Sequence, residues 1–318
     1  MVELRPMTIE AHLASKETFL AHRLNYYAQE KIIEPSGPVS LKLRRLKPDA
    51  VIITASNNRL LNLRIAHQKL TEQQGKVNWA WLIVDNKSTD GTSNYFQDLK
   101  DDRIVVVSSG SKLGCAYPVR NFGLDITAAT FWGGHYGRPQ IIVIDSDDHL
   151  FGSHSLHELS MIDRSNRILA LVHGYSDTII HYSDGNSEHV ANPRDTSSSF
   201  PKVENLAETL YKGLNILAGA FPIELLSRLR YPAERSFEDG GFNEKLMLMA
   251  QKHGQSWLEH LYPITIKHFH KKSMSEINNG QGDVTKIDKV GPYQVSGIRA
   301  DIVSYYRSLM DYFTREDL

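Results

Sequence analysis

The 318-residue sequence is poor in the features that mark specialised classes of protein. It has a single cysteine, Cys115, which cannot form an internal disulfide, so a small disulfide-stapled fold is excluded. No apolar run reaches the length of a transmembrane helix, and the Met1 end carries no run of signal-peptide type. We therefore expect a reducing, cytoplasmic setting.

An excess of charge of one sign is also missing. Lys and Arg total 36 against 37 for Asp and Glu, whereas non-specific binding of nucleic acid needs a basic field. Nucleic acid is therefore a poor first guess for a partner. Glycine (21) and proline (12) are far from collagen-like or disordered levels, and the length suits one large α/β domain or two medium ones.

Residues 1–47 are predicted to form a helical N-terminal extension. Apolar residues recur there at helical spacing until Pro35-Ser-Gly-Pro38 interrupts the pattern. The basic, amphipathic stretch Leu41–Lys47 follows, and we interpret it as a solvated helix face. Peripheral contact with the inner face of a membrane is the alternative.

From Asp49 onwards, short apolar runs alternate with helix-length stretches, which is typical of βαβ units. The runs lie at 50–54, 79–84, 103–107 and 140–144. Each is almost continuously apolar, as expected for a strand that helices cover on both faces. The pattern predicts an α/β fold with a Rossmann-like, mainly parallel central sheet flanked by helices. Ligands of such sheets bind beyond the carboxyl ends of the strands.

The pattern is looser after residue 150. A long polar stretch at 184–202 is predicted to be a loop of the kind that often forms lids or binding segments. The other predicted elements are helices at 154–164, 206–214, 222–229 and 243–253, strands at 170–182 and 262–267, a polar tail at 276–288 and an amphipathic helix at 298–313.

Three carboxylates, Asp145, Asp147 and Asp148, follow the apolar run at 140–144. At that density they repel one another and raise one another's pKa unless a cation neutralises them. A hard divalent ion, Mg²⁺ or Mn²⁺, suits such oxygen ligands and can also bridge to phosphate. The alternative is an acidic turn that caps the next helix.

A second polar turn, Asp85-Asn-Lys-Ser-Thr-Asp-Gly-Thr92, follows the run at 79–84. Its side chains are suited to reading a nucleobase or a ribose. The alternative is a helix-start turn, which every α/β protein needs.

Taken in order, the strand-end segments resemble those of the family 2 glycosyltransferases, which have the GT-A fold. Thr54-Ala-Ser-Asn-Asn-Arg59 is similar to the family's Pro-Thr-Tyr-Asn turn, and Val84–Thr92 to its Val-Asp-Asp-Gly-Ser-Thr-Asp-Gly-Thr turn. Leu113–Leu124 is similar to Gly-x-x-x-Ala-Arg-Asn-x-Gly, and Asp145–Asp148 to the DxD motif. Because four motifs occur in the right order, the resemblance is specific, and it covers about residues 48–275.

Two further segments match downstream. Phe237-Glu-Asp-Gly-Gly-Phe242 is similar to the family segment whose Glu-Asp pair supplies the base, and Lys267–Ser275 to its His-x-x-Ser-Met-Ser ending. The spacing of the latter fits His270 better than His268. The resemblance implies that Asp239 accepts the proton of the acceptor hydroxyl, with Glu238 as the second candidate.

The resemblance further implies a metal-dependent, inverting transfer of a hexosyl or N-acetylhexosaminyl group from a nucleotide-diphosphate sugar, with UDP favoured. The acceptor would be a hydroxyl of a glycan, a lipid-linked glycan or another molecule. The implied domain spans residues 48–275, with a nucleotide-sugar-binding half (48–150) and an acceptor-binding half (151–275), and residues 276–318 form a tail and helix. The implied donor-binding residues are Thr54, Ala55, Asn57, Arg59, Asp85, Asn86, Arg120, Asp145, Ser146 and Asp147, and the implied ligands of Mn²⁺ or Mg²⁺ are Asp147, Asp148 and His270.

These roles agree with the chemistry of the transfer. The departing diphosphate gains negative charge, which a divalent cation stabilises, and Arg120 can pair with its oxygens. The sequence departs from the family at Asn86, where a second Asp is usual, and at Ser56, where Tyr is usual. Both positions bear on the recognition of the base.

Two other functions share this fold. A sugar nucleotidyltransferase usually has an early Gly-rich phosphate loop, and residues 54–59 contain no glycine. An inactive, glycosyltransferase-like binding module is the third reading. The intact carboxylates at 145, 147, 148, 238 and 239 argue against it, because such charge density is costly to keep.

Overall fold

The computed structural model describes residues 37–109, 112–113, 116–131, 138–160, 170–181, 187–190, 220–227, 229–231, 242, 246 and 256–269. The described helices are α2 (Gly37–Leu46), α3 (Leu60–Thr71), α4 (Thr92–Asp98), α5 (Ala116–Phe131), α6 (Ser155–Ser160) and the 3₁₀ helix η3 (Ile223–Ser227). The described strands are β1 (Ala50–Ser56), β2 (Trp79–Asp85), β3 (Ile104–Ser108), β4 (Gln140–Val143), β5 (His149–Leu150), β6 (Ala170–His181), β7 (Ser187–Val190), β8 (Ala220–Pro222) and β9 (Ser256–Phe269).

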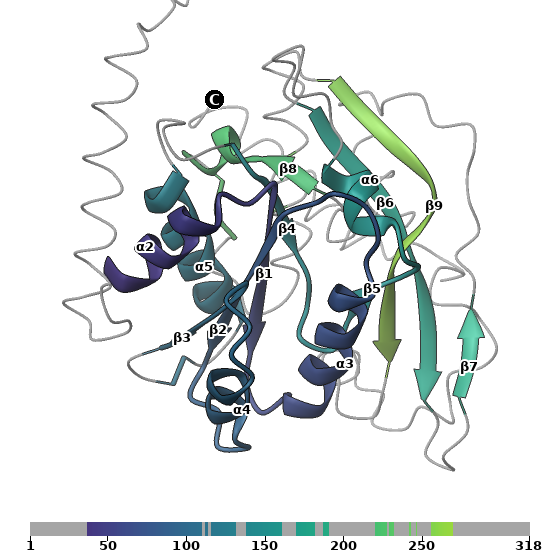
Figure 1. Cartoon of the computed structure of the whole chain (residues 1–318). Helices are drawn as coiled ribbons and strands as arrows, with labels where there is room; N and C mark the ends of the chain where they lie inside the picture. Colours follow the sequence, from purple (N-terminus) through teal and green to yellow (C-terminus); the bar gives the residue numbers. More distant parts are fainter. Residues whose placement is uncertain are drawn as a thin grey trace, which may run out of the picture.

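The described strands form one sheet in the order β3-β2-β1-β4-β8-β6-β9-β5, with β7 beside β6 (Figure 1). Strands β3, β2, β1 and β4 run parallel to one another. Strand β8 is antiparallel to β4 and to β6, whereas β6 and β9 are parallel. The chain therefore forms a mainly parallel α/β sheet in the half that carries the predicted donor site.

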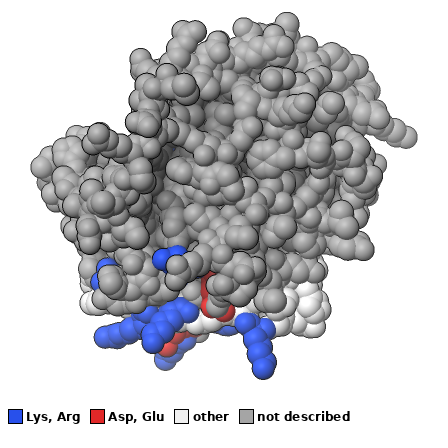
Figure 2. All heavy atoms as spheres, turned by 90° about the horizontal axis from the view of Figure 1, so that it is seen from above, with Lys and Arg blue, Asp and Glu red and all other residues white. Residues whose placement is uncertain are grey.

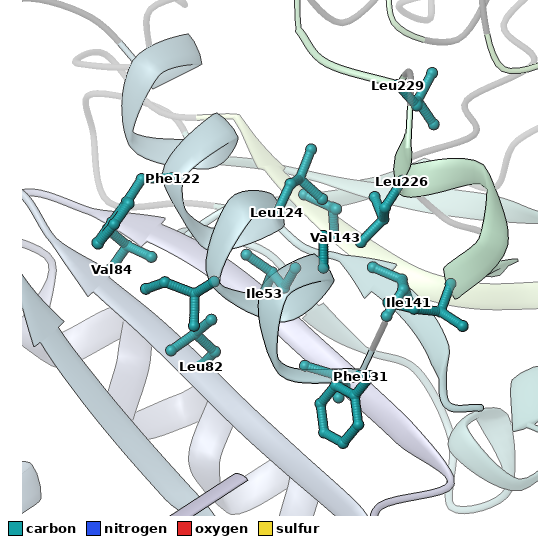
Figure 3. Close-up of a cluster of buried hydrophobic side chains, with 14 of the residues drawn as sticks. Ile53, Leu82, Val84, Phe122, Leu124, Phe131, Ile141, Val143, Leu226 and Leu229 are labelled. Carbon is teal, nitrogen blue, oxygen red and sulfur yellow. The ribbon is translucent and has the colours of Figure 1, made fainter. Parts of the chain in front are cut away.

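One face of the sheet is covered by α2, α5 and η3. The odd-numbered residues of β1, including Val51 and Ile53, point into this layer. They pack there against α5, which has twelve buried residues. Figure 3 shows the resulting apolar cluster, in which α5 and η3 both contact the sheet.

The opposite face is covered by α3, α4 and α6. In Figure 1, α3 lies on the other side of β1 from α2 and α5. Ile52 of β1 and Trp81 of β2 pack there against Leu63 of α3 and Phe96 of α4. Strands with apolar side chains on both faces read as continuous apolar runs, which is why the sequence reveals them.

The four strands predicted in the first half of the domain are confirmed as β1 to β4, with ends that differ by at most a few residues. The helix predicted at 154–164 is confirmed in part as α6, and the strand predicted at 262–267 is part of the longer β9. The stretch at 170–182 forms the single long strand β6. Of the helical extension predicted at 1–47, Gly37–Leu46 forms α2, and residues 1–36 lie outside the described residues. The predicted tail at 276–318 and the helix predicted at 206–214 also lie outside them.

Two predictions after residue 150 hold only in part. Of the helix predicted at 222–229, Ile223–Ser227 is helical, but as the short 3₁₀ helix η3, and Pro222 ends β8. The stretch predicted as a loop at 184–202 contains β7, which pairs with β6 through residues such as Glu188 and His189. Strand β8 pairs with β4, which is distant in sequence, whereas β7 pairs with the preceding strand β6. Periodicity within a short window registers neither pairing.

Two basic residues of α2 have structural partners. Lys42 Nζ donates to Ile104 O at 2.9 Å, and Arg44 Nε donates to Thr130 O at 3.1 Å at the end of α5. Cations placed at the carboxyl end of a helix stabilise it. Lys and Arg side chains project along one edge of the molecule in Figure 2. Within the described residues, no helix combines the length and the apolarity needed to cross a membrane.

Gly123 allows α5 to lie close to the sheet. A Cβ atom at this position would stand 2.5 Å from Cγ2 of Ile53 and 3.2 Å from Cγ2 of Val84. Both neighbours are fully buried, so neither has free space to move into. A larger residue would therefore push α5 away from β1 and β2.

We predict that Gly123→Ala lowers the free energy of unfolding by about 1 to 3 kcal/mol, the usual cost of overpacking a core. Chemical denaturation measures this change. The double variant Gly123→Ala/Ile53→Ala is the control, because it removes the clashing methyl group and should lose less than the sum of the two single changes. A Gly123→Ala protein as stable as its parent would contradict the packing described.

Candidate functional site

The carboxyl ends of β1, β2 and β4 meet at one edge of the sheet. Hydrogen bonds continue there beyond the regular strands, since Asn86 N donates to Ser56 O at 2.7 Å and Ile144 N donates to Ile53 O at 3.0 Å. Ser109 N donates in the same way to Asp85 O at 2.8 Å. The turns that follow these strands therefore start from fixed positions.

The turns after β1 and β2 are joined by side-chain hydrogen bonds. Asn57 Nδ2 donates to Asn86 O at 2.7 Å, and Ser88 Oγ accepts from Asn58 N at 2.8 Å. Asn58 has a φ of 53°, in the left-handed region that Asn tolerates, and its Oδ1 accepts from Thr89 N at 2.7 Å. The two turns form one structural unit.

Asp90 links this unit to the amino ends of two helices. Its carboxylate accepts from Leu60 N at 2.8 Å at the start of α3, and from Thr92 N at 3.1 Å and Thr92 Oγ1 at 2.6 Å at the start of α4. Burial raises the pKa of Asp90, but the hydrogen bonds from Thr92 and Leu60 outweigh it and hold the pKa below its ordinary value. Asp90 thus caps both helices.

The first two residues of the β2 turn are buried and bonded internally. Asp85 is 3% exposed, and its two carboxylate oxygens accept from Ser88 N at 3.2 Å and Ser93 Oγ at 3.3 Å. Asn86 Nδ2 donates to Leu113 O at 2.8 Å, while its Oδ1 accepts from Leu113 N at 2.7 Å. Ser109 Oγ lies 3.3 Å from that oxygen and 3.2 Å from Asp85 O, and its one hydrogen can bond to either.

The acidic turn after β4 is approached by two arginines. Asp148 N donates to Asp145 O at 3.0 Å, which closes the turn. Arg120 Nη2 of α5 lies 2.5 Å from Asp145 Oδ1, and Arg59 Nη2, from the β1 turn, lies 4.0 Å from Asp147 Oδ2. The acidic turn therefore faces two guanidinium groups, one from α5 and one from the turn after β1.

The described residues contain no group of three His, Cys, Asp or Glu side chains arranged to hold a metal ion. Mg²⁺ sites nevertheless often use only one or two protein carboxylates and take the remaining oxygens from water and from substrate phosphates. Asp147 and Asp148 fit that donor set. The third predicted ligand, His270, lies outside the described residues.

Neither a protein-family model nor a curated protein matches this sequence. Among solved structures, S. aureus TarS 1–349 in complex with UDP-GlcNAc is similar, with a TM-score of 0.52 and 15% identity, over 84% of this chain and 67% of that one. The chain has the GT-A fold.

Two further structures are similar at lower scores. A second structure of S. aureus TarS 1–349 has a TM-score of 0.49 and 16% identity, over 69% of this chain and only 60% of that one. The mannosyltransferase PcManGT from Pyrobaculum calidifontis, in complex with GDP-Man and Mn²⁺, has a TM-score of 0.46 and 14% identity, over 83% of this chain and 67% of that one. At these identities the likeness concerns the fold alone.

Within the GT-A fold, several predicted site residues come together. Arg59, Arg120, Asp145 and Asp147 form the cluster at the acidic turn. Thr54, in contrast, lies 2% exposed beneath it, where its Oγ1 accepts from Trp81 Nε1 at 3.0 Å. Glu238, Asp239 and His270 lie outside the described residues. Of the remaining predicted residues, Ala55 lies in β1 and Asp85 ends β2, whereas Asn57, Asn86 and Ser146 belong to the turns that follow the strands.

Sequence reasoning missed the residues that support the site. Asn58 and Asp90 fix the β1 and β2 turns, and an Asp followed by Gly at a helix start was a usable signal for such a cap. Ser56 is 3% exposed and offers no surface for stacking on a base. The contact between Arg120 and the ring of Tyr231, with the guanidinium carbon 5.1 Å from the ring centroid, joins distant segments and had no signal in the sequence.

We predict that Asp90→Ala lowers the free energy of unfolding by about 0.5 to 1 kcal/mol at pH 7, the cost of losing a cap. Because the folded-state pKa of Asp90 lies below 3.8, the carboxylate stabilises the fold fully above that pH, and this stabilisation is lost as the pH falls through the folded-state pKa. Urea denaturation of parent and variant between pH 7 and pH 3 measures the difference.

The control is Asp98→Ala, which removes an exposed carboxylate at the far end of α4. It should leave stability nearly unchanged at every pH. A difference between parent and Asp90→Ala that stayed constant down to pH 3 would show that the charge of Asp90 contributes nothing.

Proposed function

We propose that this protein is a glycosyltransferase that moves a sugar from a nucleotide-diphosphate donor to an acceptor hydroxyl. The observation that carries the proposal is the cluster of Asp145, Asp147, Arg59 and Arg120 at the carboxyl edge of a GT-A sheet. No other cluster among the described residues combines opposite charges with a position at that edge of the parallel strands.

The topology indicates where the donor would bind. The chain passes from β1 to β2 and β3 on one side, and then returns to place β4 on the other side of β1. The gap between β1 and β4 is thus a topological switch point, and ligands of open α/β sheets bind outside the strand ends at such points. Arg59 follows β1 and the acidic turn follows β4, so both flank this position.

The charges at the switch point suit a diphosphate and a cation. Asp147 and Asp148 would hold Mn²⁺ or Mg²⁺, with His270 as the third predicted ligand, and the ion would supply neutralisation of the departing diphosphate. Arg59 is the better exposed of the two arginines, with 28% of its side chain accessible against 7% for Arg120. We therefore assign Arg59 to direct contact with the donor phosphates.

Recognition of the nucleobase would depend on Asn86. Asn86 Oδ1 already accepts from Leu113 N, so it could accept the imide hydrogen of uracil only with Ser109 Oγ bonded to Asp85 O instead. We propose a UDP-sugar donor, because the similar TarS structure holds UDP-GlcNAc, and we propose that backbone groups beside Asn86 read the base. The sugar would be a hexosyl or N-acetylhexosaminyl group.

Transfer of the sugar to the acceptor needs a general base that takes the proton of the acceptor hydroxyl. Resemblance to the family assigns that role to Asp239, with Glu238 beside it, and a carboxylate that accepts the proton of an attacking hydroxyl is what an inverting displacement requires. We propose that the acceptor is a glycan or a lipid-linked glycan, and that it binds in the second half of the domain.

The first test is nucleotide binding. Isothermal titration with UDP should give binding that strengthens when Mn²⁺ is added, and Asp147→Asn should weaken the Mn²⁺-dependent part roughly tenfold or more, as should Asp148→Asn. Asp98→Asn serves as the matched carboxylate control and should bind like the parent. Failure of UDP, dTDP and GDP to bind in the presence of Mn²⁺ would refute the function.

The second test separates binding from transfer. Asp239→Asn should bind UDP-sugar as the parent does, because the amide preserves the shape of the side chain, but transfer to acceptor should fall by at least about a hundredfold. Product formation is followed by chromatography with a panel of glycan acceptors. Undiminished transfer would remove Asp239 as the base, and consumption of sugar phosphate with nucleoside triphosphate would instead identify a nucleotidyltransferase.

A further inference from the structure

Arg120 is buried between two partners at the start of α5. Only 6% of the residue is exposed, although a guanidinium group is among the most strongly polar side chains. Its Nη2 atom bonds to Asp145 Oδ1, and its guanidinium carbon lies over the ring of Tyr231. A buried cation is tolerated when a carboxylate pairs with it and an aromatic face covers it.

Tyr231 is itself held in place by its neighbours. The side chain of Asn121 pairs with the Tyr231 backbone, donating from Nδ2 to Tyr231 O at 3.0 Å and accepting from Tyr231 N at 2.7 Å. The Tyr231 ring stacks on Phe242 with centroids 4.1 Å apart and planes 9° apart. The aromatic surface beneath Arg120 is therefore rigid.

A buried ion pair anchors the residue before Tyr231. Arg230 Nε donates to Asp125 Oδ1 at 2.6 Å, and Arg230 Nη1 donates to Leu229 O at 2.6 Å. Asp125 is 0% exposed, so its charge depends on this partner. Residues 120, 121 and 125 of one helix thus hold a segment that is distant in sequence, and that segment in turn holds Arg120.

We propose that Arg120 is a positioning residue, which acts on the donor by fixing the carboxylate of Asp145 and does not contact the diphosphate. This inference rests on the proposed function and revises the direct diphosphate contact expected for Arg120 from the sequence. With Arg120 in place, the side chain of Asp145 is held in one orientation. The positive charge of Arg120 also offsets the negative charge of Asp145 on the side of the acidic turn that faces α5. Lysine could not replace it, because a point charge lacks the planar face that covers Tyr231.

The test is a double-mutant cycle on UDP affinity with Arg120→Gln, Asp145→Asn and the double variant, measured by titration with Mn²⁺ present. Each single change should weaken binding roughly tenfold, the equivalent of about 1.4 kcal/mol. The double variant should be little weaker than either single variant, because both changes remove the same interaction. Additive losses, about a hundredfold in the double variant, would overturn the inference and show that Arg120 contacts the donor itself.

A matched arginine provides the control. Arg59→Gln combined with Asp145→Asn should give additive losses, since Arg59 lies beside Asp147 and not beside Asp145. The ligand profile adds a second readout that general destabilisation would not change. Across uridine, UMP and UDP, the losses caused by Arg120→Gln should parallel those caused by Asp145→Asn. A loss that appears only when the second phosphate is present would contradict the inference.

Unfolding temperatures of the parent, the two single variants and the double variant of the Arg120 and Asp145 cycle are measured without ligand. They distinguish a failure of the positioning role from a failure of the proposed function. Non-additive temperature shifts would show that the pair exists in the free protein. If the parent then bound no nucleotide, the proposed function would fail while the pair stood. If nucleotide bound with additive losses, the positioning role would fail alone. Arg120→Lys, which keeps the charge but not the planar group, is measured beside Arg120→Gln against poor folding of the latter, and it too should bind UDP more weakly than the parent.

Discussion

The close packing of α5 on β1 and β2 is the constraint on which the candidate site depends. Gly123 permits it, because any Cβ atom there would meet Ile53 and Val84. Once α5 lies at this distance, Arg120 reaches the turn after β4, and Asn121 and Asp125 reach the segment at 229–231. The position of one apolar contact thus determines where three polar side chains act.

The buried polar side chains of α5 each need a group of opposite charge or a hydrogen-bond partner. Burying Asp125 or Arg120 alone would cost several kcal/mol, so each charge is matched by an opposite one. The hydroxyl groups of Thr127 and Thr130 are satisfied within the helix, by Gly123 O and Ile126 O. A helix that is buried over most of its length can therefore carry charge to the edge of the sheet, provided that the receiving segment supplies counter-charges and carbonyl groups.

The parts of this structure that the sequence predicts are those determined by local pattern. Strands β1 to β4 are apolar runs with polar ends, so both their positions and the edge at which Asp85 and Asp145 gather could be predicted. The 3₁₀ helix η3 could not, because packing against distant segments decides it. Strand β7 could not either, because Ser187–Val190 is not an apolar run and becomes a strand by pairing with β6. The same holds within the site. The motif containing Arg120 was recognisable, but its pairing with Asp145 and its cover by Tyr231 arise only when α5 and residues 229–231 meet.

The charges of the acidic turn bear on whether the proposed donor site would use a cation. Asp145, Asp147 and Asp148 bring three negative charges, and Arg59 and Arg120 bring two positive ones, so the cluster retains an excess negative charge. A nucleoside diphosphate adds further negative charge at close range, and at a partly buried site such repulsion is screened far less than in water. Arg120 is already committed to Asp145, which leaves Arg59 as the one guanidinium of the cluster available to phosphate oxygens. A divalent ion held by Asp147 and Asp148 would replace this repulsion by attraction. A protein that bound its donor here without such an ion would need cationic groups beyond this cluster, and the dependence of UDP affinity on Mn²⁺ therefore measures whether the acidic turn is the donor site.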